Sequence, residues 1–145
     1  MKTELLQQSR EEVLGSVTRV RERPLVLVVE DHDDTRLLLK TLLELRGVSV
    51  VEAGGGEEAV ALFERERPDL VLMDAVLPGM DGLAATRRMR CVASLKAVPI
   101  IFLSGRAEPD FRTLALEAGC DGYLTKPLHI REIDGALAQH LSREG

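Results

Sequence analysis

Five short apolar runs, separated by segments of helical periodicity, constrain the fold of this chain more than any other feature of its sequence. Three of them consist almost entirely of Val, Leu, Ile, Met or Phe and show little alternation of polar and apolar positions. Such runs are typical of strands that are buried on both faces of a parallel sheet. The predicted strands cover residues 25–29, 48–52, 69–73, 99–103 and 122–125.

A segment with helical periodicity follows each predicted strand. Parallel strands need long crossover connections, and helices are the usual ones. The alternation therefore predicts an α/β fold, a doubly wound sheet of five parallel strands with five helices on its two faces. The predicted helices cover residues 35–46, 57–67, 82–90, 109–118 and 130–141.

The first of these helices has recognisable start and stop signals. Asp33 or Asp34 is a suitable N-cap, and Gly47 is a suitable C-terminal stop. We predict that its apolar stripe, which faces the sheet, consists of Leu37, Leu38, Leu42 and Leu45.

Residues 1–23 lie outside this repeating pattern. Leu6, Val13, Val17 and Val20 would lie on nearly the same face of a short amphipathic helix. We interpret this segment as a helical extension or linker. Two roles stay open for it, a solvated helix packed on the domain or a helix for dimerisation or signalling.

The charge distribution argues against nucleic acid as a direct partner. The net charge of −5 is the sum of +1 over residues 1–23 and −6 over residues 24–145. An acidic domain repels phosphate backbones. The chain also lacks the ~20 consecutive apolar residues that cross a bilayer, so we expect no membrane association and a cytoplasmic location. The scattered His32, His129 and His140 are interpreted as surface or capping residues.

Chemically useful side chains occur at the carboxyl ends of four predicted strands. These ends are where open parallel sheets bind ligands. The side chains are Glu30, Asp31, Asp74, Ser104 and Lys126. Three carboxylates packed together need raised pKa values or a cation, and Mg²⁺ prefers carboxylate and water oxygens. The set predicts phosphoryl transfer onto a carboxylate, with Lys126 and Ser104 as donors to an oxyanion.

Four sequence blocks resemble the receiver domains of bacterial response regulators. They are Val26–Asp31, Leu72–Gly82, Pro99–Gly105 and Gly122–Pro127, in that order, within a likeness that runs from about Pro24 to Leu141. The resemblance implies a flavodoxin-like sheet with strand order 2-1-3-4-5. It also implies a receiver domain over residues 24–145.

The resemblance further implies which residue accepts the phosphoryl group and which ones hold the metal. Asp74 would be the phosphoacceptor and would take the group from a phosphohistidine on a sensor histidine kinase or a phosphotransfer protein. Asp31 and Asp74 would ligate Mg²⁺ directly, Glu30 would act through bound water, and Val76 would contribute its main-chain carbonyl. No other cofactor is expected.

In the family that this chain resembles, a hydroxyl, a lysine and an aromatic residue transmit the signal. Ser104 and Lys126 would hold the phosphoryl oxygens, and Tyr123 would turn inward when Ser104 moves. The peptide bond between Lys126 and Pro127 is expected to be cis. A downstream protein or an output domain would read the altered face, and a homodimer is possible. Beyond self-phosphorylation from phosphodonors and autodephosphorylation, no enzymatic activity is expected.

Particular residues argue against two other kinds of phosphate-handling protein. A haloacid-dehalogenase-like phosphatase needs a second acid two residues after the nucleophile, where this chain has Val76. A phosphate-binding P-loop would require Gly-Lys-Ser/Thr after the glycines at 54–56. Two alternatives stay open: a receiver that only binds partners without phosphorylation, and a receiver module cut from a hybrid histidine kinase or a larger regulator. The kinase, output partner, stimulus and oligomeric state are not encoded in a recognisable pattern.

Overall fold

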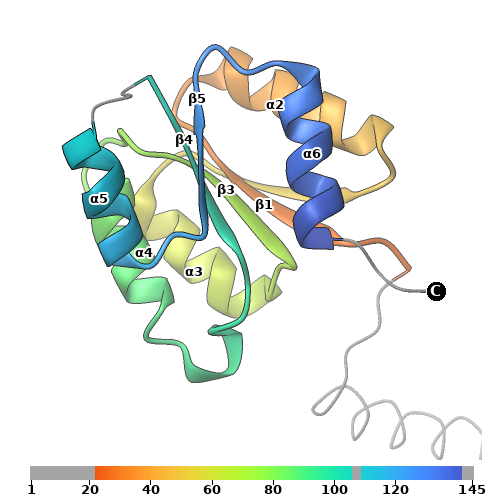
Figure 1. Cartoon of the computed structure of the whole chain (residues 1–145). Coiled ribbons are helices and arrows are strands. Elements are labelled where there is room, and N and C mark those ends of the chain that lie inside the picture. Colours follow the sequence, from red (N-terminus) through yellow and green to blue (C-terminus); the bar gives the residue numbers. More distant parts are fainter. Residues whose placement is uncertain (1–21, 106–108, 142–145) are drawn as a thin grey trace, which may run out of the picture.

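The computed structural model describes residues 22–105 and 109–141, and over these residues the chain folds as five parallel strands flanked by helices (Figure 1). The strands are β1 (Leu25–Val29), β2 (Ser49–Ala53), β3 (Leu70–Asp74), β4 (Ile100–Ser104) and β5 (Gly122–Thr125). The helices are α2 (Asp33–Leu45), α3 (Gly56–Glu66), α4 (Gly82–Met89), α5 (Pro109–Ala118) and α6 (Ile130–Leu141), with a short 3₁₀ turn, η1 (Ala93–Leu95). The predicted fold class is confirmed.

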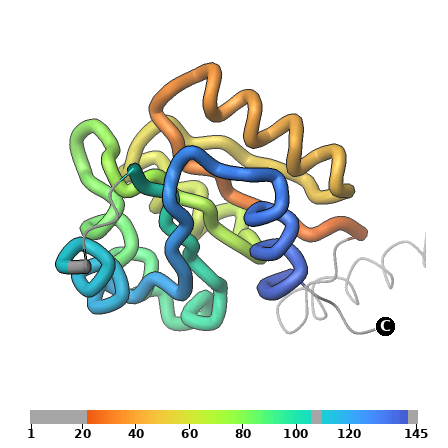
Figure 2. Tube along the Cα trace, turned by 45° about the horizontal axis from the view of Figure 1, so that its top comes forward, coloured from red at the N-terminus to blue at the C-terminus, as the bar shows by residue number. Residues whose placement is uncertain are grey.

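The strand order is β2-β1-β3-β4-β5, as the family resemblance implied. α2 and α6 cover one face of the sheet, and α3, α4 and α5 cover the other, as Figures 1 and 2 show from two directions. Each face has its own apolar layer. Val26 and Val28 of β1 face Leu39 and Leu43 of α2, whereas Leu27 on the opposite face belongs to the layer over α3, α4 and α5.

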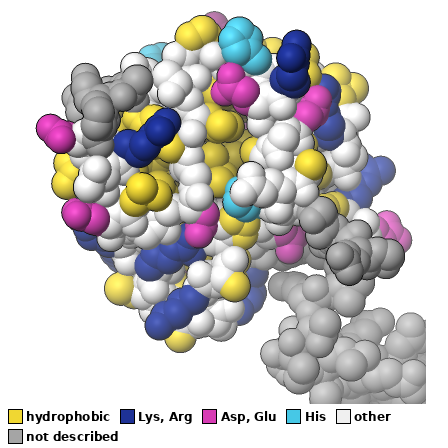
Figure 3. Space-filling model, viewed as in Figure 1, with side chains coloured by type: hydrophobic (Ala, Val, Ile, Leu, Met, Phe, Trp, Pro, Cys, Tyr) yellow, Lys and Arg dark blue, Asp and Glu magenta, His cyan; other side chains and the backbone are white. Residues whose placement is uncertain are grey.

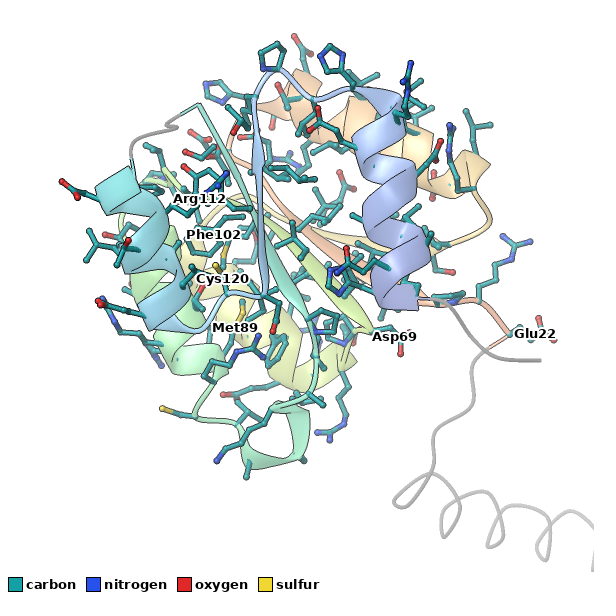
Figure 4. The ribbon with its side chains drawn as sticks, viewed as in Figure 1. Glu22, Asp69, Met89, Phe102, Arg112 and Cys120 are labelled. Carbon is teal, nitrogen blue, oxygen red and sulfur yellow. The ribbon has the colours of Figure 1, made fainter. Side chains whose placement is uncertain are left out.

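The second layer contains the larger side chains. Phe63 and Phe102 are fully buried there, and Figure 4 shows Phe102, Met89 and Cys120 lying between the sheet and the helices α4 and α5. β1, β3 and β4 are buried along their whole length, which explains why their sequences lack alternation. The sheet interior is therefore a rigid base for residues at its edge.

Three strands are displaced by one residue from their predicted positions. β2, β3 and β4 each begin and end one residue later than the predicted 48–52, 69–73 and 99–103. As a result Asp74 and Ser104 are the last residues of their strands rather than the first loop residues. Their main chains are held by ladder hydrogen bonds, which restricts where their side chains can lie.

The predicted apolar stripe of the first helix was right for Leu42, which packs against the apolar layer on that face of the sheet, and wrong for its other three leucines. Leu39 and Leu43 are the buried residues of α2, whereas Leu37, Leu38 and Leu45 are 59%, 59% and 73% exposed. Leucines occur at so many positions of this helix that the sequence offered two stripes, and only packing against the sheet selected one.

The predicted capping of α2 was also wrong. The helix begins at Asp33, and His32 occupies the N-cap position without a side-chain capping bond. Asp33 and Asp34 lie in the first turn, where their charges favour the helix dipole. Gly47 does follow the helix end with a positive φ of 84°.

The predicted extension over residues 1–23 lies, apart from Glu22 and Arg23, outside the described residues. Among the helices that the structure describes, none is both long and apolar enough to cross a membrane.

Candidate functional site

Main-chain hydrogen bonds continue the strand ladders past the strand ends and position the site. The amide of Glu30 donates to the carbonyl of Ala53 over 3.0 Å. The amide of Ala75, directly after Asp74, donates to Leu103 over 3.0 Å, and that of Lys126 donates to Ser104 over 2.7 Å. Residues from β1, β3, β4 and β5 thereby meet at one edge of the sheet. All four predicted strand ends contribute.

Lys126 joins two of the predicted acids. Its ammonium donates to Glu30 Oε1 over 2.9 Å and to Asp74 Oδ2 over 3.0 Å. The side chains of Glu30 and Asp74 are only 1% and 7% exposed, whereas that of Lys126 is 28% exposed. The lysine therefore closes the buried pair from the solvent side.

Burial and mutual repulsion affect the ionisation of this group. Burial raises the pKa of Glu30 above its ordinary value, and neighbouring Asp74 raises it further, while the bond from Lys126 acts in the opposite direction. Burial lowers the pKa of Lys126, but its bonds to Glu30 and Asp74 outweigh this, so its pKa lies above the ordinary value. The raised pKa values of Glu30 and Lys126 both fit a group of side chains that holds more negative than positive charge.

The second oxygen of Asp74 is held by the loop after β3. The Val76 amide donates to Asp74 Oδ1 over 3.0 Å, while the Val76 side chain is 58% exposed. Gly82, the first residue of α4, lies so close that a Cβ there would be 3.0 Å from the Asp74 carbonyl oxygen. The carboxylate is therefore fixed by Lys126 on one oxygen and by Val76 on the other.

Four residues at this edge could together hold a metal ion. Glu30, Asp31, His32 and Asp74 each place one potential ligand atom within 4.8 Å of the others. Three carboxylates against one lysine leave a surplus of two negative charges when all are ionised. A small divalent cation would neutralise this surplus, so the donor set fits the predicted metal.

His32 and Arg36 were missed as neighbours of the site. His32 Nδ1 lies 3.3 Å from both Glu30 Oε2 and Asp31 Oδ1, so its interpretation as a surface or capping residue is only half right: the ring is exposed, but it contacts the acids. Its position next to Glu30-Asp31 in the sequence was the available signal. Arg36 donates to the Glu30 carbonyl over 2.8 Å, for which the sequence held no signal.

Ser104 and Tyr123, the predicted switch residues, lie on neighbouring strands. Ser104 is 1% exposed, and its register partner on β5 is Thr125. Tyr123 is half-buried; its ring packs edge-on against Phe111 with centroids 6.1 Å apart, and the Arg112 guanidinium lies 5.1 Å from its centroid. The Lys126–Pro127 peptide bond is cis, as expected.

Known proteins resemble this chain over most of its length. The family model described as "Response regulator receiver domain" matches residues 26–138. The phosphate regulon transcriptional regulatory protein PhoB of Pseudomonas aeruginosa is 35% identical over 120 residues, which are 83% of this chain and 52% of PhoB. The chain spans about half the length of the curated relatives it matches.

Solved structures agree closely in fold. The receiver domain of the sensor histidine kinase PA1611 from Pseudomonas aeruginosa, with magnesium coordinated in its active-site cleft, is 34% identical, with a TM-score of 0.77 over 82% of this chain and 98% of that one. The chemotaxis protein CheY4 of Vibrio cholerae is 26% identical, with a TM-score of 0.78 over 81% of this chain and 98% of that one.

Proposed function

The chain belongs to the response regulator receiver domain family, and on this premise we propose that it accepts a phosphoryl group on Asp74 in a Mg²⁺-dependent reaction. The observation that carries the proposal is the convergence of Glu30, Asp74 and Lys126, since Lys126 bonds both carboxylates at the end of a buried sheet. Asp31 and the Val76 carbonyl would complete the metal ligands, with Glu30 acting through water. Mg²⁺, when bound, would neutralise charge on the phosphoryl oxygens.

The protein's own groups orient the nucleophile. A carboxylate oxygen of Asp74 attacks the phosphorus of a phosphohistidine or a small phosphodonor, the new P–O bond forms, and the bond to the leaving group breaks. The Val76 amide holds one oxygen of Asp74, which limits rotation of the carboxylate. Lys126 already contacts the other oxygen and would follow the incoming phosphoryl oxygens, with the Ser104 hydroxyl as a further donor.

The chemistry proposed is limited to self-phosphorylation and autodephosphorylation.

The phosphoryl group would draw Ser104 toward it and favour an inward Tyr123, in a shift between two pre-existing conformations. Tyr123 contacts Phe111 of α5, so its movement would alter the face formed by α5, β5 and α6. A histidine kinase or phosphotransfer protein would supply the group, and a downstream protein or output domain would read that face.

The direct test is incubation of the full chain with acetyl phosphate and Mg²⁺. Intact-mass analysis should show one added phosphoryl group on the wild type and on Asp110→Asn, which changes an exposed acid of α5, but none on Asp74→Asn. Equal labelling of Asp74→Asn would contradict the assignment. An unlabelled wild type that still binds Mg²⁺ would favour the interaction-only alternative.

The switch has its own test. Beryllofluoride with Mg²⁺ should shift amide signals across α5, β5 and α6, whereas changes confined to residues beside Asp74 would contradict it.

A second candidate is a receiver module within a longer protein. It is supported by the likeness to the receiver of the sensor histidine kinase PA1611 and by relatives about twice as long as this chain. The reading frame on either side of the sequence tests it.

A further inference from the structure

His32 is an exposed residue in contact with the acidic group. Its Nδ1 atom is 3.3 Å from Glu30 Oε2 and 3.3 Å from Asp31 Oδ1. Lys126 contacts the other oxygen of Glu30, Oε1. The buried carboxylate of Glu30 therefore has a lysine on one oxygen and an imidazole nitrogen close to the other.

The distance between the His32 ring nitrogen and the neighbouring carboxylate is suited to binding one metal ion together. Adjacent ligands of an octahedral ion with bonds of 2.0–2.1 Å are about 3.0 Å apart, close to the 3.3 Å between His32 Nδ1 and Asp31 Oδ1, the neighbouring carboxylate that would ligate the ion directly. One atom each of Glu30, Asp31, His32 and Asp74 lies within 4.8 Å of the others, so small rotations of the exposed His32 and Asp31 side chains would complete the set. The ring makes no capping bond to α2 that such a rotation would break.

We infer that His32 is a nitrogen ligand at this carboxylate site and shifts its preference from Mg²⁺ toward Mn²⁺ and similar first-row divalent ions. The inference rests on the metal site of the proposed function and adds one donor to it. Mg²⁺ binds oxygen ligands almost exclusively and gains little from imidazole, whereas Mn²⁺, although it also binds oxygen well, accepts an imidazole nitrogen, and the later ions Fe²⁺, Co²⁺ and Ni²⁺ bind that nitrogen better still. Coordination through Nδ1 leaves the proton on Nε2, at the exposed end of the ring.

A hydrogen-bonding role for His32 would have a different signature. If the His32 ring only forms hydrogen bonds to Glu30 or Asp31, it acts on a bound ion through these carboxylates. Its removal would then change the affinity for every divalent ion to a similar degree. A ring that ligates would selectively favour ions that accept nitrogen. The ratio of Mn²⁺ to Mg²⁺ affinity, together with direct detection of a bound nitrogen, distinguishes the two roles.

The test uses the full chain with Mn²⁺ or Mg²⁺ as the only added metal. Pulsed electron paramagnetic resonance of bound Mn²⁺ should show coupling to an imidazole ¹⁴N in the wild type and in His129→Ala, a matched control at another exposed histidine, but not in His32→Ala. Calorimetry should show Mn²⁺ affinity about tenfold lower in His32→Ala, with Mg²⁺ affinity nearly unchanged.

The other outcomes are equally decisive. Bound Mn²⁺ without nitrogen coupling in the wild type would overturn the role of His32 and leave the proposed function intact. Equal losses of Mn²⁺ and Mg²⁺ affinity in His32→Ala would overturn the metal preference. A wild type that binds neither ion would overturn both the inference and the Mg²⁺ dependence of the proposed function.

Discussion

Two charged clusters at opposite ends of the same sheet differ in how completely their charges are matched. At the carboxyl ends of the strands lies the acidic site, defined here as Glu30, Asp31, Asp74 and Lys126. At the amino ends of β4 and β5 lies the arginine cluster, defined as Arg90 and Asp121 with the carbonyls that Arg90 contacts. Arg90 donates to the carbonyl oxygens of Gly119, Val98 and Lys96 and to Asp121 Oδ2, which also accepts from the Ile100 amide.

The two clusters place stabilising interactions at one end of the sheet and a ligand site at the other. In the arginine cluster one cation meets one anion, and the guanidinium is surrounded by acceptors, so the group can only hold loops together. In the acidic site three carboxylates share one lysine, and burial raises the pKa of Glu30. A surplus of like charge costs stability unless a ligand removes it. The two clusters should therefore respond oppositely to substitution.

The face of the molecule in Figure 3 carries charged side chains of both signs. Figure 3 shows basic and acidic side chains interspersed with apolar ones over the face that it presents. The contrast between the clusters thus lies in how side chains are paired at the two ends of the sheet.

The largest expected effect is on stability, at the arginine cluster. Arg90→Leu should lower the free energy of unfolding by about 2 kcal/mol, because it leaves the part-buried carbonyls of Gly119 and Val98 without their charged donor. Urea denaturation followed by circular dichroism measures this. Arg88→Leu, at an exposed position of the same helix, is the matched control and should be nearly neutral. Mg²⁺ affinity of the folded Arg90→Leu variant should equal that of the wild type; a large loss would show that the clusters are coupled.

The next effect is on metal affinity, at the acidic site. Glu30→Gln keeps a partner for Lys126 but removes one negative charge, so Mg²⁺ affinity should fall about tenfold, or about 1.4 kcal/mol. The metal-free variant should be more stable than the wild type at neutral pH, because a buried charge has been removed. Calorimetry and thermal melts give the two values. A variant less stable than the wild type without metal would contradict the idea of surplus charge.

A smaller effect concerns the pH dependence of the metal-free protein. The pKa of Glu30 is raised in the folded chain, so its stabilising contribution is fully present below the ordinary value of 4.5 and is lost as the pH rises through the raised pKa. The stability advantage of Glu30→Gln should accordingly be absent in acid and grow toward neutral pH. Melting temperatures at several pH values, without divalent ions, test this; an advantage independent of pH would assign the effect to packing.

The smallest effect is expected at a solvent-exposed ion pair between α2 and α6. Arg46 donates to Asp134 over 2.7 Å and lowers the pKa of that carboxyl. Its contribution is present above the ordinary pKa of 3.8 and is lost as the pH falls through the lowered value. Both groups are exposed, so Asp134→Asn should change the melting temperature only slightly, and only at pH values above that range. If Asp134→Asn lowered the melting temperature as much as Arg90→Leu does, then the burial of a hydrogen-bonded charge would not determine the size of these effects.

Much of the acidic site could be predicted because strand ends can be read from the chain. Asp74, Ser104 and Lys126 follow apolar runs, and parallel strands bring such ends to one edge whatever the details of packing. The arginine cluster offered no such signal. Arg90 ends a helix at an ordinary position, and its partners at residues 98, 119 and 121 are distant in the chain, so only the assembled fold brings them together.

The sequence by itself determined the α/β class, the number of strands and the acids that would meet, because apolar runs and their spacing are local properties. The tertiary structure alone decided which leucines of α2 face the sheet, that Lys126 bonds Glu30 as well as Asp74, and that the His32 ring reaches two carboxylates. Each of these depends on side-chain distances of a few ångströms across separate elements, or on the rotation of a helix about its axis. Periodicity in the sequence does not specify either quantity; close packing against neighbouring elements does.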